Sequence, residues 1–65
     1  MRYVQVKDDE VALVMDYAEL EVLYSALVYL TENEDVDFYD DIRNQKFENV
    51  CLKVEELYED IDRPP

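Results

Sequence analysis

Hydrophobic positions recur at helical spacing between residues 16 and 32, the most apolar stretch of the chain. Asp16 precedes this run and Glu19 follows three residues later, a spacing that predicts a capping box at a helix start. Neither Gly nor Pro interrupts the segment, so we expect one continuous helix. Its main apolar stripe, at intervals of three and four residues, consists of Leu20, Leu23, Leu27 and Leu30.

The opposite side of this predicted helix is also nearly free of charge. A helix that is apolar almost all round needs cover on more than one side. Either another element of the chain or a second copy of it could supply that cover. Small side chains in the second line favour a close helix approach, and we predict this line as the dimer face: Ala18, Val22, Ser25 and Tyr29.

The N-terminal segment has two stretches with strand patterns: residues 2–6 alternate weakly between apolar and polar residues, and residues 11–15 form a short apolar run of strand length. Residues 2–6 and 11–15 are rich in strand formers and flank a polar turn at 7–10, which predicts a β-hairpin. Because the chain contains no Gly, we expect Asp to supply any positive φ in this turn. The alternative is a helix that begins at Asp9 and runs through Met15, but Asp16 would then fall within the leucine stripe.

The C-terminal half reads as an acidic stretch followed by a second helix. Residues 32–41 contain six acidic residues and no basic one, and Asp37 is the expected cap of the next helix. Arg43 falls in a core-like position, so either one long helix or two helices divided near Arg43 would fit the pattern. The apolar face within 46–61 consists of Phe47, Val50, Cys51, Val54, Leu57, Tyr58 and Ile61.

These elements predict a mainly helical α+β fold: an N-terminal β-hairpin followed by two antiparallel helices. The alternative is an all-α helical hairpin. The 65 residues form a single domain, and domains this small usually need a disulfide, a metal or a partner. Cys51 is the only cysteine and there is no His, so neither an intrachain disulfide nor a zinc site is available. We therefore expect a homodimer.

Acidity limits the partners of this chain. The formal net charge is −12, from 18 acidic and 6 basic residues. This charge disfavours direct binding to nucleic acid or to an anionic membrane, and it favours a basic protein surface. The chain has no apolar signal region after Met1 and Arg2, and its lone cysteine suits a reducing compartment. We expect a cytoplasmic location.

The residue types that most enzymes use are missing. Without Gly there is no phosphate-binding loop, and without His the commonest general base is absent. Ser25 has no neighbouring base in the sequence, and Cys51 suits a buried apolar position better than a reactive one. The acidic clusters lack the Gly and the closing Glu of an EF-hand. We predict no catalytic residue, no cofactor and no metal site, and therefore no enzyme.

Two functions remain compatible with this sequence. The first is an inhibitor or regulator that occupies a basic protein surface, including one that normally holds nucleic acid. Its predicted binding residues are Glu34, Asp35, Asp37, Asp40 and Asp41. The second is a helical oligomerisation or adaptor module that uses its Leu and Tyr faces, with acidity serving only solubility. The six Tyr suit either core-edge packing or an interface.

Overall fold

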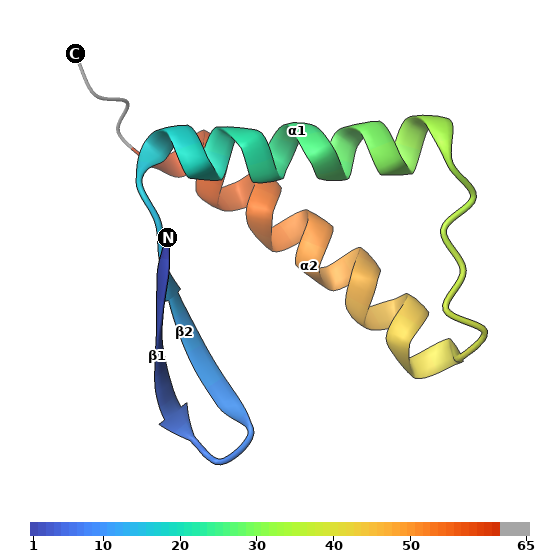
Figure 1. Cartoon of the computed structure of the whole chain (residues 1–65). Helices are drawn as coiled ribbons and strands as arrows, with labels where there is room; N and C mark the ends of the chain where they lie inside the picture. The colour runs from blue at the N-terminus through green and yellow to red at the C-terminus, as the bar shows by residue number, and fades with distance from the viewer. Residues whose placement is uncertain (62–65) are drawn as a thin grey trace.

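A computed structural model describes residues 1–61 of the chain. An antiparallel hairpin is followed by two contacting helices (Figure 1). This confirms the predicted mainly helical α+β fold, and the all-helical alternative is wrong. The elements are β1 (Arg2–Lys7), β2 (Glu10–Val14), α1 (Tyr17–Asn33) and α2 (Asp41–Asp60).

The hairpin strands pair as the alternating pattern predicts. Tyr3 lies opposite Leu13 and Val4 opposite Ala12, while the register shifts next to Val6. Neither Asp8 nor Asp9 adopts a positive φ, so the turn forms without the conformation that Asp was expected to supply if one were needed. The register shift is a β-bulge beside the turn, and a bulge increases the local strand twist that positive φ usually supplies in short hairpin loops.

The start of α1 is a capping box, as predicted. The Glu19 backbone N–H donates to the Asp16 carboxylate at 2.8 Å, and the Asp16 N–H donates to the Glu19 carboxylate at 3.0 Å. Glu19 also pairs with the terminal ammonium group of Met1. The bond to the ammonium group, followed by the one from Asp16, lowers the pKa of Glu19 below its ordinary value.

The second helix begins three residues later than predicted. Its N-cap is Asp40, whose carboxylate accepts from the Ile42 N–H at 2.9 Å, and the prediction of Asp37 as the cap is wrong. α2 is one continuous helix. Arg43 lies in its exposed first turn, 3.9 Å from the Asp40 carboxylate, rather than in the core, because the two helices have not yet approached each other there (Figure 1).

The core lies where α2 returns to the start of α1. Leu20 and Val54, at 5% and 7% exposed, are the two buried hydrophobic residues among residues 1–61. Beside them, Tyr58 stacks on Tyr24 at a ring distance of 4.3 Å and on Tyr17 at 5.8 Å. The Tyr17 hydroxyl is buried and has no hydrogen-bond partner, so it does not reach water as core-edge packing would suggest.

The predicted apolar face of α2 is only partly buried. Phe47, Cys51 and Tyr58 are half-buried, whereas Val50 and Leu57 are exposed. The cause is the divergence of the two helices toward the loop that joins them (Figure 1). A diverging pair buries a narrower stripe than two helices in contact along their whole length.

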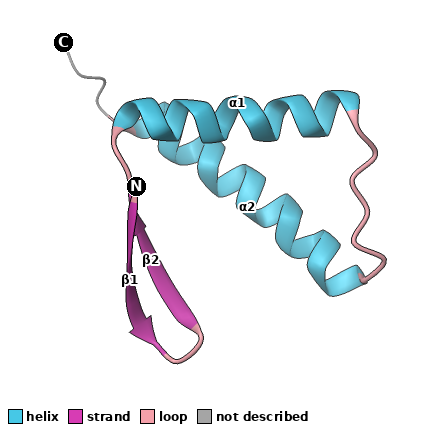
Figure 2. Ribbon diagram, viewed as in Figure 1, coloured by secondary structure: helices cyan, strands magenta, loops and turns pink. Residues whose placement is uncertain are grey.

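The hairpin stands apart from both helices (Figure 2). Every residue of β1 and β2 is exposed, and the two strands contact each other but neither helix. The molecule measures 40 × 33 × 17 Å along its principal axes, so it is thin and open. Along residues 1–61, neither helix is long and apolar enough to span a membrane.

We predict that Asp16→Ala lowers the free energy of unfolding by about 1 kcal/mol, because the Glu19 N–H loses its acceptor. Chemical denaturation of both proteins measures the difference. Asp16→Asn is the matched control: it keeps an accepting oxygen and should cost only about a few tenths of a kcal/mol. Equal stability of the parent and the Ala variant would contradict a capping role.

Tyr58→Leu should destabilise the helix pair by about 1–2 kcal/mol, because leucine keeps the apolar bulk and loses both ring stacks. Leu57→Ala is the control, since this neighbouring side chain is exposed and should change stability by no more than about 0.5 kcal/mol. Thermal unfolding followed by circular dichroism compares the three proteins. If the Leu57 variant loses more stability than the Tyr58 variant, the proposed role of the ring stack is wrong.

Candidate interaction surfaces

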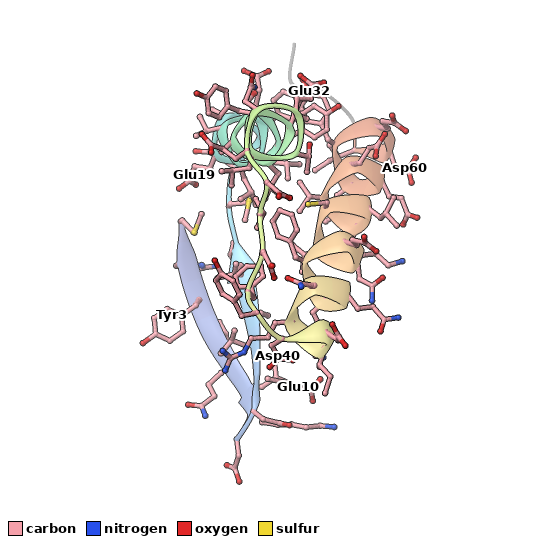
Figure 3. All side chains as sticks on the ribbon, turned by 90° about the vertical axis from the view of Figure 1, so that its right-hand side faces the viewer. Tyr3, Glu10, Glu19, Glu32, Asp40 and Asp60 are labelled. Atoms are coloured by element: carbon pink, nitrogen blue, oxygen red, sulfur yellow. The ribbon has the colours of Figure 1, made fainter. Side chains whose placement is uncertain are left out.

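The predicted acidic residues all lie on one short connection between the helices. Glu34 is the C-cap of α1, Asp35 and Asp37 follow in the loop, Asp40 caps α2, and Asp41 is the first residue of that helix. All five are exposed. Four of the five lie outside the helices, and Asp40 lies where the loop meets α2 (Figure 3), so the course of the loop sets the positions of these carboxylates.

Hydrogen bonds hold this loop instead. The Asp37 carboxylate accepts from the Tyr39 N–H at 2.8 Å and from the Asn44 side-chain amide at 3.0 Å. The Asn44 side-chain oxygen in turn accepts from the Phe38 N–H at 2.8 Å. The bond from Asn44, followed by the one from Tyr39, lowers the pKa of Asp37. Asp37 and Asp40 are therefore structural residues as well as charged ones.

Tyr39 is a surface residue that the sequence did not single out. The helical reading placed it inside a helix next to Phe38, but it lies in the loop and is 93% exposed. Its φ of 57° is the only positive φ among residues 1–61. A left-handed conformation is uncommon for a residue with a bulky side chain. The neighbouring Phe38 instead packs on Phe47 at a ring distance of 5.8 Å.

Little positive charge lies near the loop. Arg43 is the basic residue that pairs with one of the five carboxylates, at 3.9 Å from Asp40. An open groove of about 470 Å³ beside the loop is lined by acidic and apolar residues, among them Glu34, Asp35, Val36 and Phe47. The loop thus joins exposed negative charge to an exposed aromatic ring.

The predicted dimer face is also uncovered. Ala18, Val22, Ser25 and Tyr29 are all exposed, with Val22 at 69% and Tyr29 at 60%. An open groove of about 520 Å³ runs along this side of α1, between Met1 and Ala26. Within residues 1–61 neither the hairpin nor α2 covers this face, so the prediction that it binds a second copy is untested by the single chain.

Cys51 lies half-buried between the two helices. Burial, followed by the nearby charge of Glu48, raises the pKa of its thiol, which favours the unreactive protonated form. In the part of the chain that the structure describes, no three Cys, Asp or Glu residues converge in a way that could hold a metal ion. The acidic loop and the outer face of α1 are the surfaces that could bind another protein.

Comparison with known proteins adds no family: no protein-family model matches the chain, and neither a curated protein nor a solved structure is significantly similar to it.

The loop hydrogen bonds predict a pH response of Asp37. Its lowered pKa means that ionised Asp37 stabilises the folded loop. This stabilisation is complete above the ordinary value of 3.8 and is lost as the pH falls through the lower folded-state pKa. Asn44→Ala should move the Asp37 titration to higher pH. Carboxyl NMR titration measures it, with the exposed neighbour Gln45→Ala as the control. An unchanged Asp37 titration in Asn44→Ala would contradict the bond.

Proposed function

We propose that this chain is a non-enzymatic protein-binding module, an inhibitor or regulator that occupies a basic surface of another protein. The observation that carries the proposal is the interhelix loop, where Glu34, Asp35, Asp37, Asp40 and Asp41 expose their carboxylates together. Protein surfaces that bind nucleic acid are basic, so they belong to the targets that such a loop suits. The site of action that fits a lone cysteine is the cytoplasm.

Three properties of the loop support this role. Its charge is mostly uncompensated, because Arg43 lies 3.9 Å from only one of the carboxylates. Its backbone is ordered by the bonds of Asp37 and Asn44, which reduces the conformational entropy lost on binding. Tyr39 adds an exposed aromatic ring, and Tyr is enriched among the residues that dominate protein interfaces.

Long-range charge adds to these local features. The formal net charge of −12 repels nucleic acid and attracts a basic protein before contact. Electrostatic attraction of this kind mainly accelerates association, and salt screens it. Binding to the proposed partner therefore weakens steeply as the ionic strength rises.

A second candidate function is favoured by a different observation. Val22 and Tyr29 expose an apolar line along α1, as an oligomerisation or adaptor module would. In the leucine stripe, Leu20 is buried and Leu27 lies beside Cys51 of α2, so the outer line and the exposed Tyr would carry this function. Binding through these side chains is apolar and changes little with salt, which separates the two candidates.

We predict that neutralising Glu34, Asp35 and Asp41 weakens binding to the basic partner about tenfold or more, mainly through slower association. The variant is Glu34→Gln, Asp35→Asn and Asp41→Asn. It spares Asp37 and Asp40, whose carboxylates hold the loop and cap α2. Immobilised protein is used to capture partners from a lysate of the source organism at low and high salt. Mass spectrometry identifies them, and binding kinetics follow with the purified partner.

The control variant is Glu21→Gln, Glu55→Gln and Glu59→Gln, which removes the same charge from exposed positions outside the loop. It should keep most of the binding if the loop is the site. Duplex DNA should compete with the chain if the partner surface normally holds nucleic acid. Equal capture by the parent and both variants, or capture that is insensitive to salt, would refute the acidic-loop function and favour the apolar alternative.

A further inference from the structure

The isolated chain exposes more surface than a compact protein of its size. Its accessible surface is 5850 Å² for a mass of 7.8 kDa, whereas a folded monomer of that mass exposes roughly 4,400 Å². The excess is on the order of 1,000 Å² per chain, which is comparable to the area that each subunit of an obligate homodimer buries. Contact with a single partner of similar size would be enough to bury this excess surface.

Much of the exposed apolar surface lies on the hairpin. Cross-strand partners share a face of a two-stranded sheet, and successive residues alternate between faces. One face therefore carries Tyr3, Val11 and Leu13, and the other carries Val4, Ala12 and Val14. Tyr3 is 72% and Leu13 56% exposed, and Tyr3 points away from the side on which α2 lies (Figure 3).

A two-stranded hairpin with this composition requires cover. Isolated hairpins are at best marginally stable in water, and strands that are apolar on both faces are typical of sheets buried on both sides. No helix of its own chain packs on either face along residues 1–61. Residues 1–61 therefore leave both faces of the hairpin without cover, and a partner could supply it.

The hairpin surface is continuous with the outer face of α1. Met1 lines both the groove along α1 that contains Ala18 and Val22 and a second groove, of about 380 Å³, that contains Arg2, Val14 and Met15. The two apolar regions therefore meet at the start of the chain. A partner that packs on one of them also reaches the other.

The distribution of charge favours a second copy as the partner. This continuous surface carries Asp16 and Glu19, which are bonded to each other's backbones, and Glu19 is also paired with the Met1 ammonium group. The acidic loop lies beyond the other end of α1 (Figure 1), roughly 25 Å away by the rise of the helix. Two copies that meet at the hairpin therefore keep their acidic loops apart and avoid most of their mutual repulsion.

We propose that two copies of this chain associate through the hairpin and the outer face of α1, so that each hairpin is covered by the partner copy. This interface is larger than the α1 line alone, because it adds the hairpin face that carries Val4, Ala12 and Val14. It is separate from the interhelix loop, so the dimer does not depend on the function proposed for the acidic residues. In the dimer both loops stay exposed.

The test uses the purified 65-residue chain at micromolar concentration. Sedimentation equilibrium should give about twice the 7.8 kDa chain mass, and the melting temperature should rise with protein concentration. Two interface variants are compared: Val4→Thr with Val14→Thr, which keeps strand propensity, and Val22→Gln with Tyr29→Gln. Each should weaken self-association about tenfold or more.

The control exchanges two exposed apolar residues of α2, Ile42→Gln with Leu52→Gln, and should leave self-association unchanged. A photoreactive benzoylphenylalanine in place of Val4, on the hairpin face assigned to the interface, tests the hairpin directly. Illumination should link two copies, and the same probe in place of Leu52 should not.

A parent chain that is a folded monomer, with a melting temperature independent of concentration, overturns the proposal. The assigned surface is wrong if the control substitutions dissociate the dimer while both interface variants still form it. The variant of Glu34, Asp35 and Asp41 should still dimerise. The loss of partner capture in that variant and the loss of dimerisation in the hairpin variant are therefore distinguishable results.

Discussion

The contact between the start of α1 and the end of α2 is the interaction on which the whole structure depends. Leu20 and Val54 are buried there, and Tyr58 stacks on Tyr17 and Tyr24. Large flat rings fill the space between two helices that meet at one end and diverge at the other, because stacked rings bury much area with few rotatable bonds. The remaining elements depend on this contact for their position, since α1 carries the hairpin at one end and the loop at the other.

Because the two helices diverge, the surface is divided into an acidic end at the interhelix loop and an apolar end at the hairpin. Where the helices separate, the connection between them must cross open space, and contacts between the loop and the start of α2 replace the missing core. Asp37 and Asn44 do this through hydrogen bonds to backbone and side chain, and Phe38 packs on Phe47. Acidic side chains suit this end because it stays in water. The opposite end of α1 keeps an uncharged helix face and an apolar hairpin, which suit contact with protein.

Local signals in the sequence were sufficient for the elements and insufficient for their packing. The hairpin and the Asp16 capping box follow from alternation and from a three-residue spacing, both of which are short-range. The bonds from Asn44 to the loop span six and seven residues and match no common cap, so the capping pattern alone predicts Asp37 in place of Asp40. Arg43 and Val50 fall in core positions of the helical pattern because periodicity reports the side of a helix and not the distance to its neighbour.

The acidic loop and the apolar surface lie at opposite ends of α1, and this separation affects how they would act together. A dimer that meets at the hairpins carries two acidic loops facing away from the interface, and each loop keeps its own hydrogen bonds. A partner with two basic sites, or a basic surface repeated along a filament, would then be held by both loops at once. The second contact is effectively intramolecular, so it strengthens binding without any new interface. The open shape of the single chain is compatible with both proposals together: the apolar end would pair the copies, and that pairing would double the acidic end.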